Sequence, residues 1–85
     1  MSLSIAWSDV CHVDIRHMHY RDAERVCAAV HEFARHGVGG LEHVSLQVSV
    51  LRARGGFALV RIEEPTIYVV RILPSSPLRR VARLL

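Results

Sequence analysis

Arginine is the residue type in this chain whose number and placement most strongly indicate a chemical role. All eleven residues of the Lys and Arg class are arginines. Residues 44–85 hold seven of them against two glutamates, a net charge of +5, whereas residues 1–43 have a net charge of −2. A guanidinium group pairs well with phosphate and carboxylate groups. The basic second half therefore predicts a polyanion or an acidic protein as the binding partner.

Six of these arginines form the candidate set for binding RNA or a protein partner: Arg52, Arg54, Arg61, Arg71, Arg79 and Arg80. Arg52 and Arg54 have the same parity at the end of one predicted strand, so we expect them on one face. Arg61 and Arg71 are expected on two adjacent strands, each in an otherwise apolar column. Two interpretations remain open. The arginines either keep the sheet soluble or form a basic surface that follows an RNA backbone or receives an acidic peptide.

Six histidines and two cysteines form no recognisable metal or catalytic pattern. His17 and His19 are two residues apart and would not share a helix face, whereas His12 and His19 are too far apart to hold one ion easily. No zinc-type spacing with cysteine occurs, so we expect neither a metal nor a cofactor. A general-base role for one histidine stays open. Cys11 and Cys27 are expected to be buried and reduced.

The length of the chain sets limits on its architecture. Its 85 residues are expected to form one domain over 1–85, with a basic tail from about residue 74. So small a domain places any activity on an open surface or shallow groove. No segment approaches the roughly 18 apolar residues that cross a bilayer, and the start lacks a secretory pattern. We therefore expect a cytoplasmic protein that does not bind membranes.

The first half of the chain predicts a short strand and two helices. Ser4–Trp7 alternates between polar and apolar residues, which is typical of a strand. Ser8 and Asp9 are suited to cap and begin a helix over residues 10–18. A second helix is expected between an N-cap at Asp22 and a C′ residue at Gly37, since apolar residues recur between them at helical spacing. This apolar stripe consists of Ala23, Val26, Cys27, Val30, Phe33 and Ala34.

From residue 44 the apolar period changes to two, which predicts three strands. We expect these over residues 44–50, 57–62 and 66–73, with turns at Gly55-Gly56 and at residues 63–65. The last strand should lie near the centre of the sheet. The expected order is β-α-α-β-β-β. The fold class is α+β, a two-layer sandwich with the short strand and two helices packed on a C-terminal antiparallel β-meander.

Three segments give the chain a resemblance to a known family. They are FARHGVG at residues 33–39, LRARGGF at 51–57 and TIYVVRI at 66–72. With the order of elements, these segments resemble the RelE/ParE toxin superfamily over roughly residues 5–72. The resemblance implies a RelE/ParE-like fold and a toxin of a bacterial type II toxin–antitoxin module, neutralised by a cognate antitoxin. RelE-like members are ribosome-dependent ribonucleases that cut mRNA, whereas ParE-like members inhibit DNA gyrase.

The resemblance also assigns roles to single residues. Arg52 and Arg54 match basic residues that help RelE-like enzymes to bind mRNA. The family usually has Gly-Tyr-Arg where this chain has Gly56, Phe57 and Ala58, so the arginine that stabilises the cleavage transition state is missing. Arg61, expected on the opposite face from Ala58, is a weak substitute as a catalytic residue.

The end of the chain departs from the family as well. Residues 74–80 replace the usual His-Arg and the tyrosine or histidine that follows it. Cleavage of a phosphodiester needs a base, an acid and a cation around one phosphate, and this sequence supplies only the cations.

Two functions are therefore open. The first is a toxin-type protein that binds RNA or the ribosome through a basic sheet face and cuts mRNA. The second is a non-enzymatic protein, either a ParE-like gyrase inhibitor or a catalytically degenerate protein that binds its antitoxin. The sequence does not decide whether the chain forms a homodimer.

Overall fold

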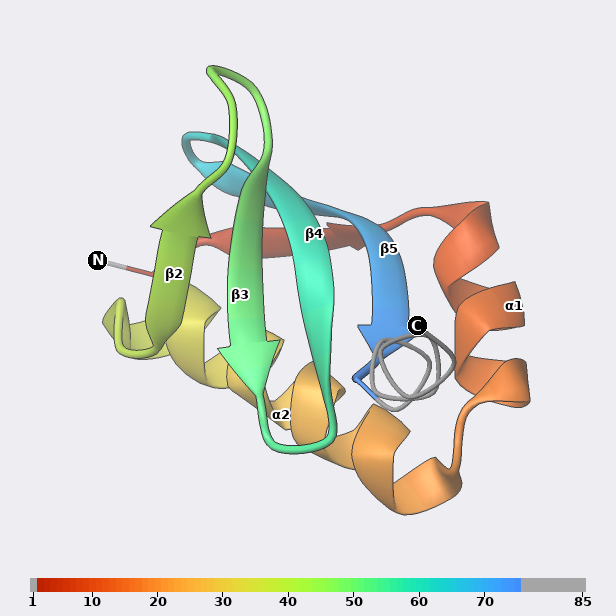
Figure 1. Ribbon diagram of the computed structural model, residues 1–85. Coiled ribbons are helices and arrows are strands. Elements are labelled where there is room, and N and C mark those ends of the chain that lie inside the picture. Colours follow the sequence, from red (N-terminus) through yellow and green to blue (C-terminus); the bar gives the residue numbers. More distant parts are fainter. Residues whose placement is uncertain (1, 76–85) are drawn as a thin grey trace.

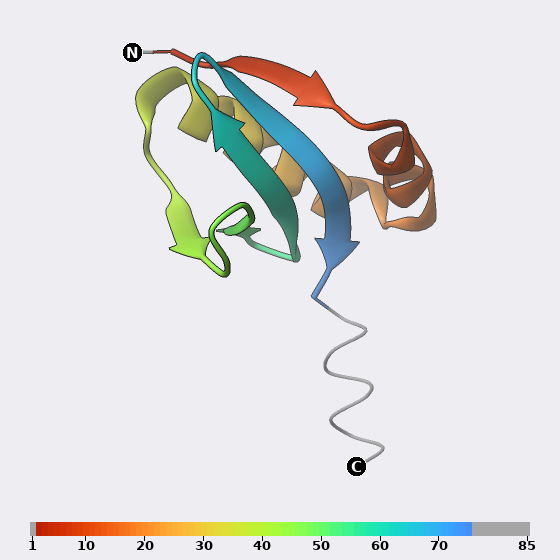
Figure 2. The same ribbon diagram turned by 90° about the horizontal axis from the view of Figure 1, so that it is seen from above.

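Two helices and a five-stranded mixed sheet make an α+β fold in the computed structural model, which describes residues 2–75 (Figure 1). The long helix covers one face of the sheet, and the short helix lies beside the last strand in the chain, Thr66–Pro74 (Figure 2). This arrangement is compatible with the predicted two-layer sandwich. The elements in chain order are β1 (Ser4–Trp7), α1 (Asp9–His17), α2 (Tyr20–His36), β2 (Gly40–His43), β3 (Ser49–Ala53), β4 (Gly56–Glu63) and β5 (Thr66–Pro74).

The strands lie in the order β1-β5-β4-β3-β2. Strands β2 to β5 form an antiparallel meander, which confirms the predicted C-terminal meander but adds one strand to it. Strand β1 runs parallel to β5, from Ser4 opposite Thr66 to Trp7 opposite Val69. Strand β5 therefore has a neighbour on each side, as predicted for the last strand.

The predicted strand over residues 44–50 is wrong. Residues 44–48 form the loop between β2 and β3, where Val44 is 66% and Leu46 106% exposed. The Ser45 hydroxyl accepts hydrogen bonds from the backbone N–H groups of Gln47 and Val48, at 3.3 and 3.2 Å. These local bonds make a turn, which competes with a strand ladder for the same backbone groups. The alternating pattern thus spans a hairpin loop.

The helices form largely as predicted. The Ser8 side chain caps α1 by accepting the Cys11 backbone N–H at 3.3 Å. The predicted N-cap at Asp22 is wrong. His19 is the N-cap, because its imidazole accepts the Arg21 backbone N–H at 3.2 Å, and helix α2 begins at Tyr20 with Asp22 in its first turn. The helix ends as predicted at Gly37, whose positive φ of 67° is left-handed and suits glycine.

The core lies between α2 and the inner face of the sheet. The buried members of the α2 stripe pack on buried aliphatic residues of β3, β4 and β5. Burying one aliphatic side chain of this kind contributes about 1.5–3 kcal/mol. The fully buried sheet residues are Leu51, Ala58, Val60, Ile67, Val69 and Ile72.

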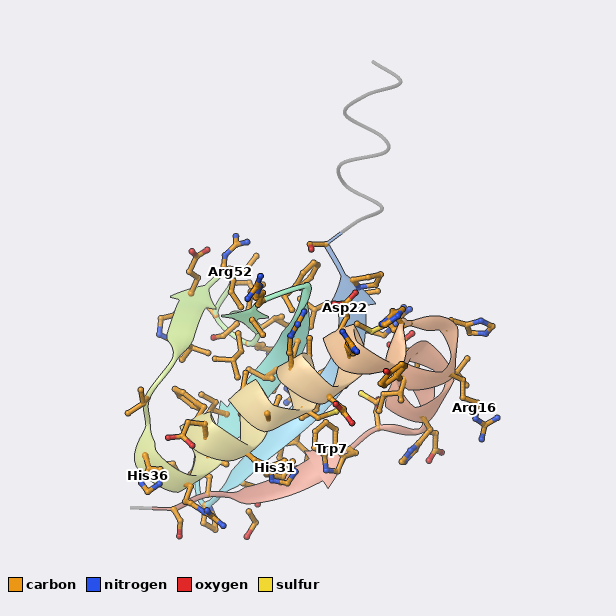
Figure 3. All side chains as sticks on the ribbon, turned by 90° about the horizontal axis from the view of Figure 1, so that it is seen from below. Trp7, Arg16, Asp22, His31, His36 and Arg52 are labelled. Carbon is orange, nitrogen blue, oxygen red and sulfur yellow. The ribbon has the colours of Figure 1, made fainter. Side chains whose placement is uncertain are left out.

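Trp7 and Cys27 pack against this core, and Cys11 belongs to it. Trp7 contacts His31 of α2, with ring centroids 5.8 Å apart (Figure 3). Both cysteines are free, Cys11 fully buried and Cys27 partly buried, and burial raises the pKa of the Cys27 thiol.

The first residue of β4 has no room for a side chain. A β-carbon on Gly56 would lie 2.6 Å from the Leu73 carbonyl oxygen and 3.0 Å from a methyl group of Val26. The carbonyl belongs to the paired strand β5 and cannot move freely. At Gly40, the first residue of β2, the nearest atom would be the Arg52 β-carbon at 3.9 Å, an ordinary contact.

We expect Gly56→Ala to lower the free energy of unfolding by about 1–3 kcal/mol, because the added methyl group overpacks the junction of β4, β5 and α2. Gly40→Ala is the matched control and should leave stability unchanged or raise it by up to about 1 kcal/mol. Urea unfolding followed by circular dichroism measures both. Equal midpoints for the two variants would contradict this account of the packing.

Candidate binding face of the sheet

The sheet face opposite α2, called the outer face below, combines apolar and charged side chains. Its apolar side chains are half-buried or exposed, and its charged ones lie around them. Strand alternation and register, with Val70 as an extra residue at the register shift opposite Leu59 and Val60, place these residues there: Glu42, Val50, Arg52, Phe57, Leu59, Arg61, Glu63, Tyr68, Val70, Arg71 and Leu73. Four of the six candidate arginines lie on or beside this face. Arg79 and Arg80 lie outside the described residues.

Arg52 and Arg61 each pair with a glutamate of the outer face. The guanidinium of Arg52 donates two hydrogen bonds to Glu42 of β2, at 3.2 and 3.3 Å. That contact raises the pKa of Arg52. Arg61 donates a hydrogen bond to Glu63, two residues along β4. Exposed pairs of this kind contribute about 0–1 kcal/mol each, yet they place carboxylates beside the cations.

Arg71 has a structural partner in α1. Its guanidinium donates two hydrogen bonds of 2.8 Å to the Asp14 carboxylate, whose Oδ2 also accepts the Ile72 backbone N–H at 3.0 Å. The Asp14 side chain is only 9% exposed. The hydrogen bond from Arg71 is the main cause of a lowered pKa at Asp14, opposed by burial and assisted by the Ile72 N–H. Arg71 is therefore committed to holding α1 against β5.

The start of α1, together with the Asp14 contact, closes an open edge of the sheet at β5. Strand β1 ends at Trp7 opposite Val69, so β5 has no neighbouring strand on that side from residue 70 onward. Exposed backbone groups at such an edge invite pairing with other chains. Ser8 covers them by donating its backbone N–H to the Val69 carbonyl at 3.0 Å and its hydroxyl to the Val70 carbonyl at 2.8 Å. The Cys11 thiol also donates to the Val69 carbonyl, at 3.2 Å.

The four described arginines do not form one basic patch. Arg61 lies opposite Tyr68 and Arg71 lies opposite Leu59, with a register shift between these two pairs. Arg71 is held by Asp14 of α1, whereas Arg61 pairs with Glu63. Arg54 lies in the β3–β4 turn at the other end of β4 and has no ion pair among residues 2–75. The predicted common face for Arg52 and Arg54 thus divides between a strand and a turn.

A shallow hollow lies where β1 meets β5 and β4. It has a volume of about 200 Å³ and is largely apolar, with Tyr68, Val70 and the Arg61 side chain among its walls. Small-molecule sites usually measure roughly 300–1,000 Å³. The hollow is therefore better suited to a single side chain of a partner.

Catalytic chemistry has little support on this face. Ala58, at the position of the missing family arginine, is fully buried in the core, so a side chain there could not reach the outer face. Arg61 lies on the opposite face, as predicted. Within residues 2–75 no group of three His, Cys, Asp or Glu side chains could hold a metal ion, and no helix is long and apolar enough to cross a membrane.

One polar pair was not found from the sequence. The His43 imidazole lies 3.0 Å from the hydroxyl of Ser49, across the β2–β3 hairpin. Ser49 is 7% exposed, and no hydrogen bond joins His43 to a carboxylate in the described part of the chain. The pair therefore satisfies a buried hydroxyl. It depends on the register of a hairpin that sequence periodicity did not reveal.

Comparison with protein-family models, curated proteins and solved structures finds no match for this chain. The likeness to the RelE/ParE superfamily therefore rests on the sequence segments and the element order.

We expect Asp14→Asn to destabilise the chain by about 1–3 kcal/mol at pH 7, since it weakens charged hydrogen bonds to Arg71 and Ile72. The lowered pKa of Asp14 means that its contribution is full above the ordinary carboxyl pKa of about 3.9 and is lost as the pH falls through the lowered value. Unfolding curves between pH 2 and 7 should therefore show a smaller pH dependence in the variant.

Asp9→Asn is the control for this prediction, because Asp9 is an exposed acid in the first turn of the same helix. Its loss should cost only a few tenths of a kcal/mol through the helix dipole. If Asp9→Asn reduced the pH dependence as much as Asp14→Asn, the edge-closing role of Asp14 would be wrong.

Proposed function

We propose that this chain is a toxin-type protein of a bacterial type II toxin–antitoxin module that acts by binding proteins, without cutting RNA. The observation that carries the proposal is the make-up of the outer face, an apolar centre bordered by arginine–carboxylate pairs. Protein interfaces have such an apolar centre and polar rim, with aromatic residues and arginine enriched. The module, and the cytoplasm as its place of action, rest on the resemblance to the RelE/ParE superfamily.

The charge balance favours a protein partner over RNA. Arg52, Arg61 and Arg71 are each paired with a different carboxylate. An RNA backbone would have to displace these carboxylates, which also repel its phosphates. Affinity for nucleic acid grows with the number of phosphates that cations neutralise. A protein segment with its own mixed charges can exchange partners with these pairs and cover the apolar residues between them.

The same surface serves two protein partners in this proposal. A cognate antitoxin would cover the apolar centre with an extended or helical segment and place one side chain in the hollow beside Tyr68. The target would be a protein such as DNA gyrase, as in ParE-like members. Burial of Ala58 supports the absence of ribonuclease activity, because a cation there could not face a phosphate.

A second function, binding of RNA or the ribosome, has one observation in its favour. Tyr68 is 42% exposed on the outer face and lies opposite Arg61 in the β4–β5 register. An exposed aromatic ring next to a cation is a common platform for a base and its phosphate. The glutamate that pairs with Arg61 counts against this function.

We expect Leu59→Glu to abolish both growth arrest on induction in a bacterial host and binding to the product of a neighbouring small reading frame. The substitution places an uncompensated charge in the apolar centre, so binding measured by calorimetry should weaken at least tenfold. Val38→Glu is the matched control, because Val38 is 61% exposed and lies outside the face. When the unchanged chain is induced, translation should continue while DNA supercoiling changes.

Other outcomes would contradict the proposal. Prompt loss of protein synthesis with mRNA cut at ribosomes would support the ribonuclease. Unaffected growth on induction would exclude a toxin acting on either target in that host. Equal binding by Leu59→Glu and Val38→Glu would exclude the outer face as the binding surface.

A further inference from the structure

Strand β2 forms one edge of the sheet. Its only strand neighbour is β3, because β2 is last in the order β1-β5-β4-β3-β2 (Figure 1). The side of an edge strand that faces away from the sheet carries backbone N–H and C=O groups that can pair with another chain. Within residues 2–75, no hydrogen bond joins the backbone of β2 to any element except β3. The edge at β2 is therefore open to a further strand, unlike the edge at β5.

The backbone groups of Leu41 and His43 face away from β3. The Val44 N–H donates to the Val48 carbonyl at 3.1 Å, so the backbone of Val44 faces β3. Hydrogen-bonded and non-hydrogen-bonded residues alternate along an antiparallel pair. The alternation makes Glu42 the next residue bonded to β3 and turns Leu41 and His43 the other way. Each of these two residues offers one N–H and one C=O group at the edge.

Exposed apolar side chains lie at both ends of this edge. Val38 precedes β2 and Val44 follows it, and both are more than half exposed. Leu46 in the β2–β3 hairpin loop is fully exposed. Apolar side chains grouped on one surface are typical of a protein contact. Natural edge strands usually avoid pairing through lysine, proline or a bulge, and β2 contains none of these.

The charges beside the edge are complementary to a second copy of themselves. Arg52 of β3 lies opposite Gly40, and it pairs with Glu42 of the same chain. A second copy that runs antiparallel, with the two Leu41 residues opposite each other, brings its own Glu42 opposite Gly40. Glycine has no side chain, and the two strands beside it are roughly 10 Å apart, so Arg52 can reach over Gly40 to that carboxylate. Twofold symmetry makes this contact twice.

Two other twofold registers use the same backbone groups and fit less well. Pairing Leu41 with His43 of the second copy places the two Glu42 side chains directly opposite each other, and like charges in that position are destabilising. Pairing the two His43 residues requires Ser45 to continue the strand, whereas its hydroxyl stabilises the hairpin turn. The register centred on Leu41 is therefore favoured.

We propose that β2 pairs with β2 of a second copy of this chain, so that two sheets join into one. The two Leu41 residues exchange backbone hydrogen bonds at the centre, and Val38 of each copy lies opposite Val44 of the other. The inference goes beyond the proposed function and does not rest on it. Leu59 and Tyr68 lie on β4 and β5 and stay uncovered, so the dimer leaves the centre of the outer face accessible.

Sedimentation equilibrium of the full chain tests the dimer. The contact uses one short strand from each copy, so we expect a dissociation constant on the order of 10⁻⁵ M. Glu42→Arg and Arg52→Glu should each weaken the dimer about tenfold or more, because like charges then face each other across Gly40. A mixture of the two variants should dimerise about as well as the unchanged chain, since opposite charges meet again in the mixed pair. An ion pair confined to one chain gives no such recovery.

Matched controls place the same charge changes away from β2. Arg16→Glu lies on α1, on the other side of the molecule from Arg52 (Figure 3), and Glu24→Arg lies in the first half of α2. Both positions are exposed, and both variants should dimerise as the unchanged chain does. Circular dichroism checks that each variant is folded.

Amide hydrogen exchange of the unchanged chain tests the register without any substitution. The Leu41 N–H should exchange more slowly above the dissociation constant than below it, because its partner is then the Leu41 carbonyl of the second copy. The Glu42 N–H, already bonded to β3, should change little. Nuclear magnetic resonance resolves the two amides. If neither charge variant folds, this measurement decides alone.

Three results would overturn the inference. One is a monomer at all concentrations up to about 10⁻³ M. Another is a dimer that Glu42→Arg leaves unchanged, or a mixture of the two folded charge variants that stays monomeric. The third is a dimer in which the Leu41 amide exchanges as fast as in the monomer, which would place the contact on another surface. None of these results bears on partner binding at Leu59, so the two proposals fail separately.

Discussion

The open edge of β5 is the constraint on which the arrangement of this fold depends. Strand β1 is four residues long and β5 nine, so a parallel pair covers only the first half of β5. Helix α1 closes the rest with the Ser8 groups and with the Asp14 carboxylate, which takes the place of a strand carbonyl at Ile72. Because the carboxylate is nearly buried, it needs a cation, and Arg71 supplies it. The position of α1 and the ion pair of Arg71 thus both follow from the unpaired backbone groups of β5.

The other arginines divide by the carboxylates within their reach. On the outer face Arg52 and Arg61 lie near glutamates, which leaves an apolar centre with little net charge. At the start of α2, Asp22 pairs with Arg25 and packs against Gly55, and neither Arg21 nor Arg54 forms an ion pair among residues 2–75. Two surfaces of different character result. On one of them the arginines pair with glutamates, whereas the other holds arginines without an ion pair in the described part of the chain.

Much of the fold could be predicted because its signals are local. The Ser8 cap, the α2 stripe, the Gly37 end and the two strand turns each depend on residues a few positions apart. The turns predicted at Gly55-Gly56 and at residues 63–65 lie at residues 54–55 and 64–65. The hairpin at residues 40–53 could not be predicted in the same way. The side chain of Ser45 stabilised a turn within an alternating apolar pattern, and the short strand β2 has no periodic signal of its own.

The sequence by itself determined the two helices, strands β1, β4 and β5 and the excess of arginine in the second half, since propensity, period and charge are properties of neighbouring residues. Only the tertiary structure decided what each arginine can do. Arg71 meets Asp14 across 57 positions of sequence, and the turn at Gly55 meets Asp22 near the start of α2. Pairing of charges depends on distance in space, which strand register and helix placement set and which no local pattern contains. For that reason the arginines of the second half differ in what they contact. Arg71 holds α1, Arg52 and Arg61 pair with glutamates on the outer face, and Arg54 lies in the β3–β4 turn.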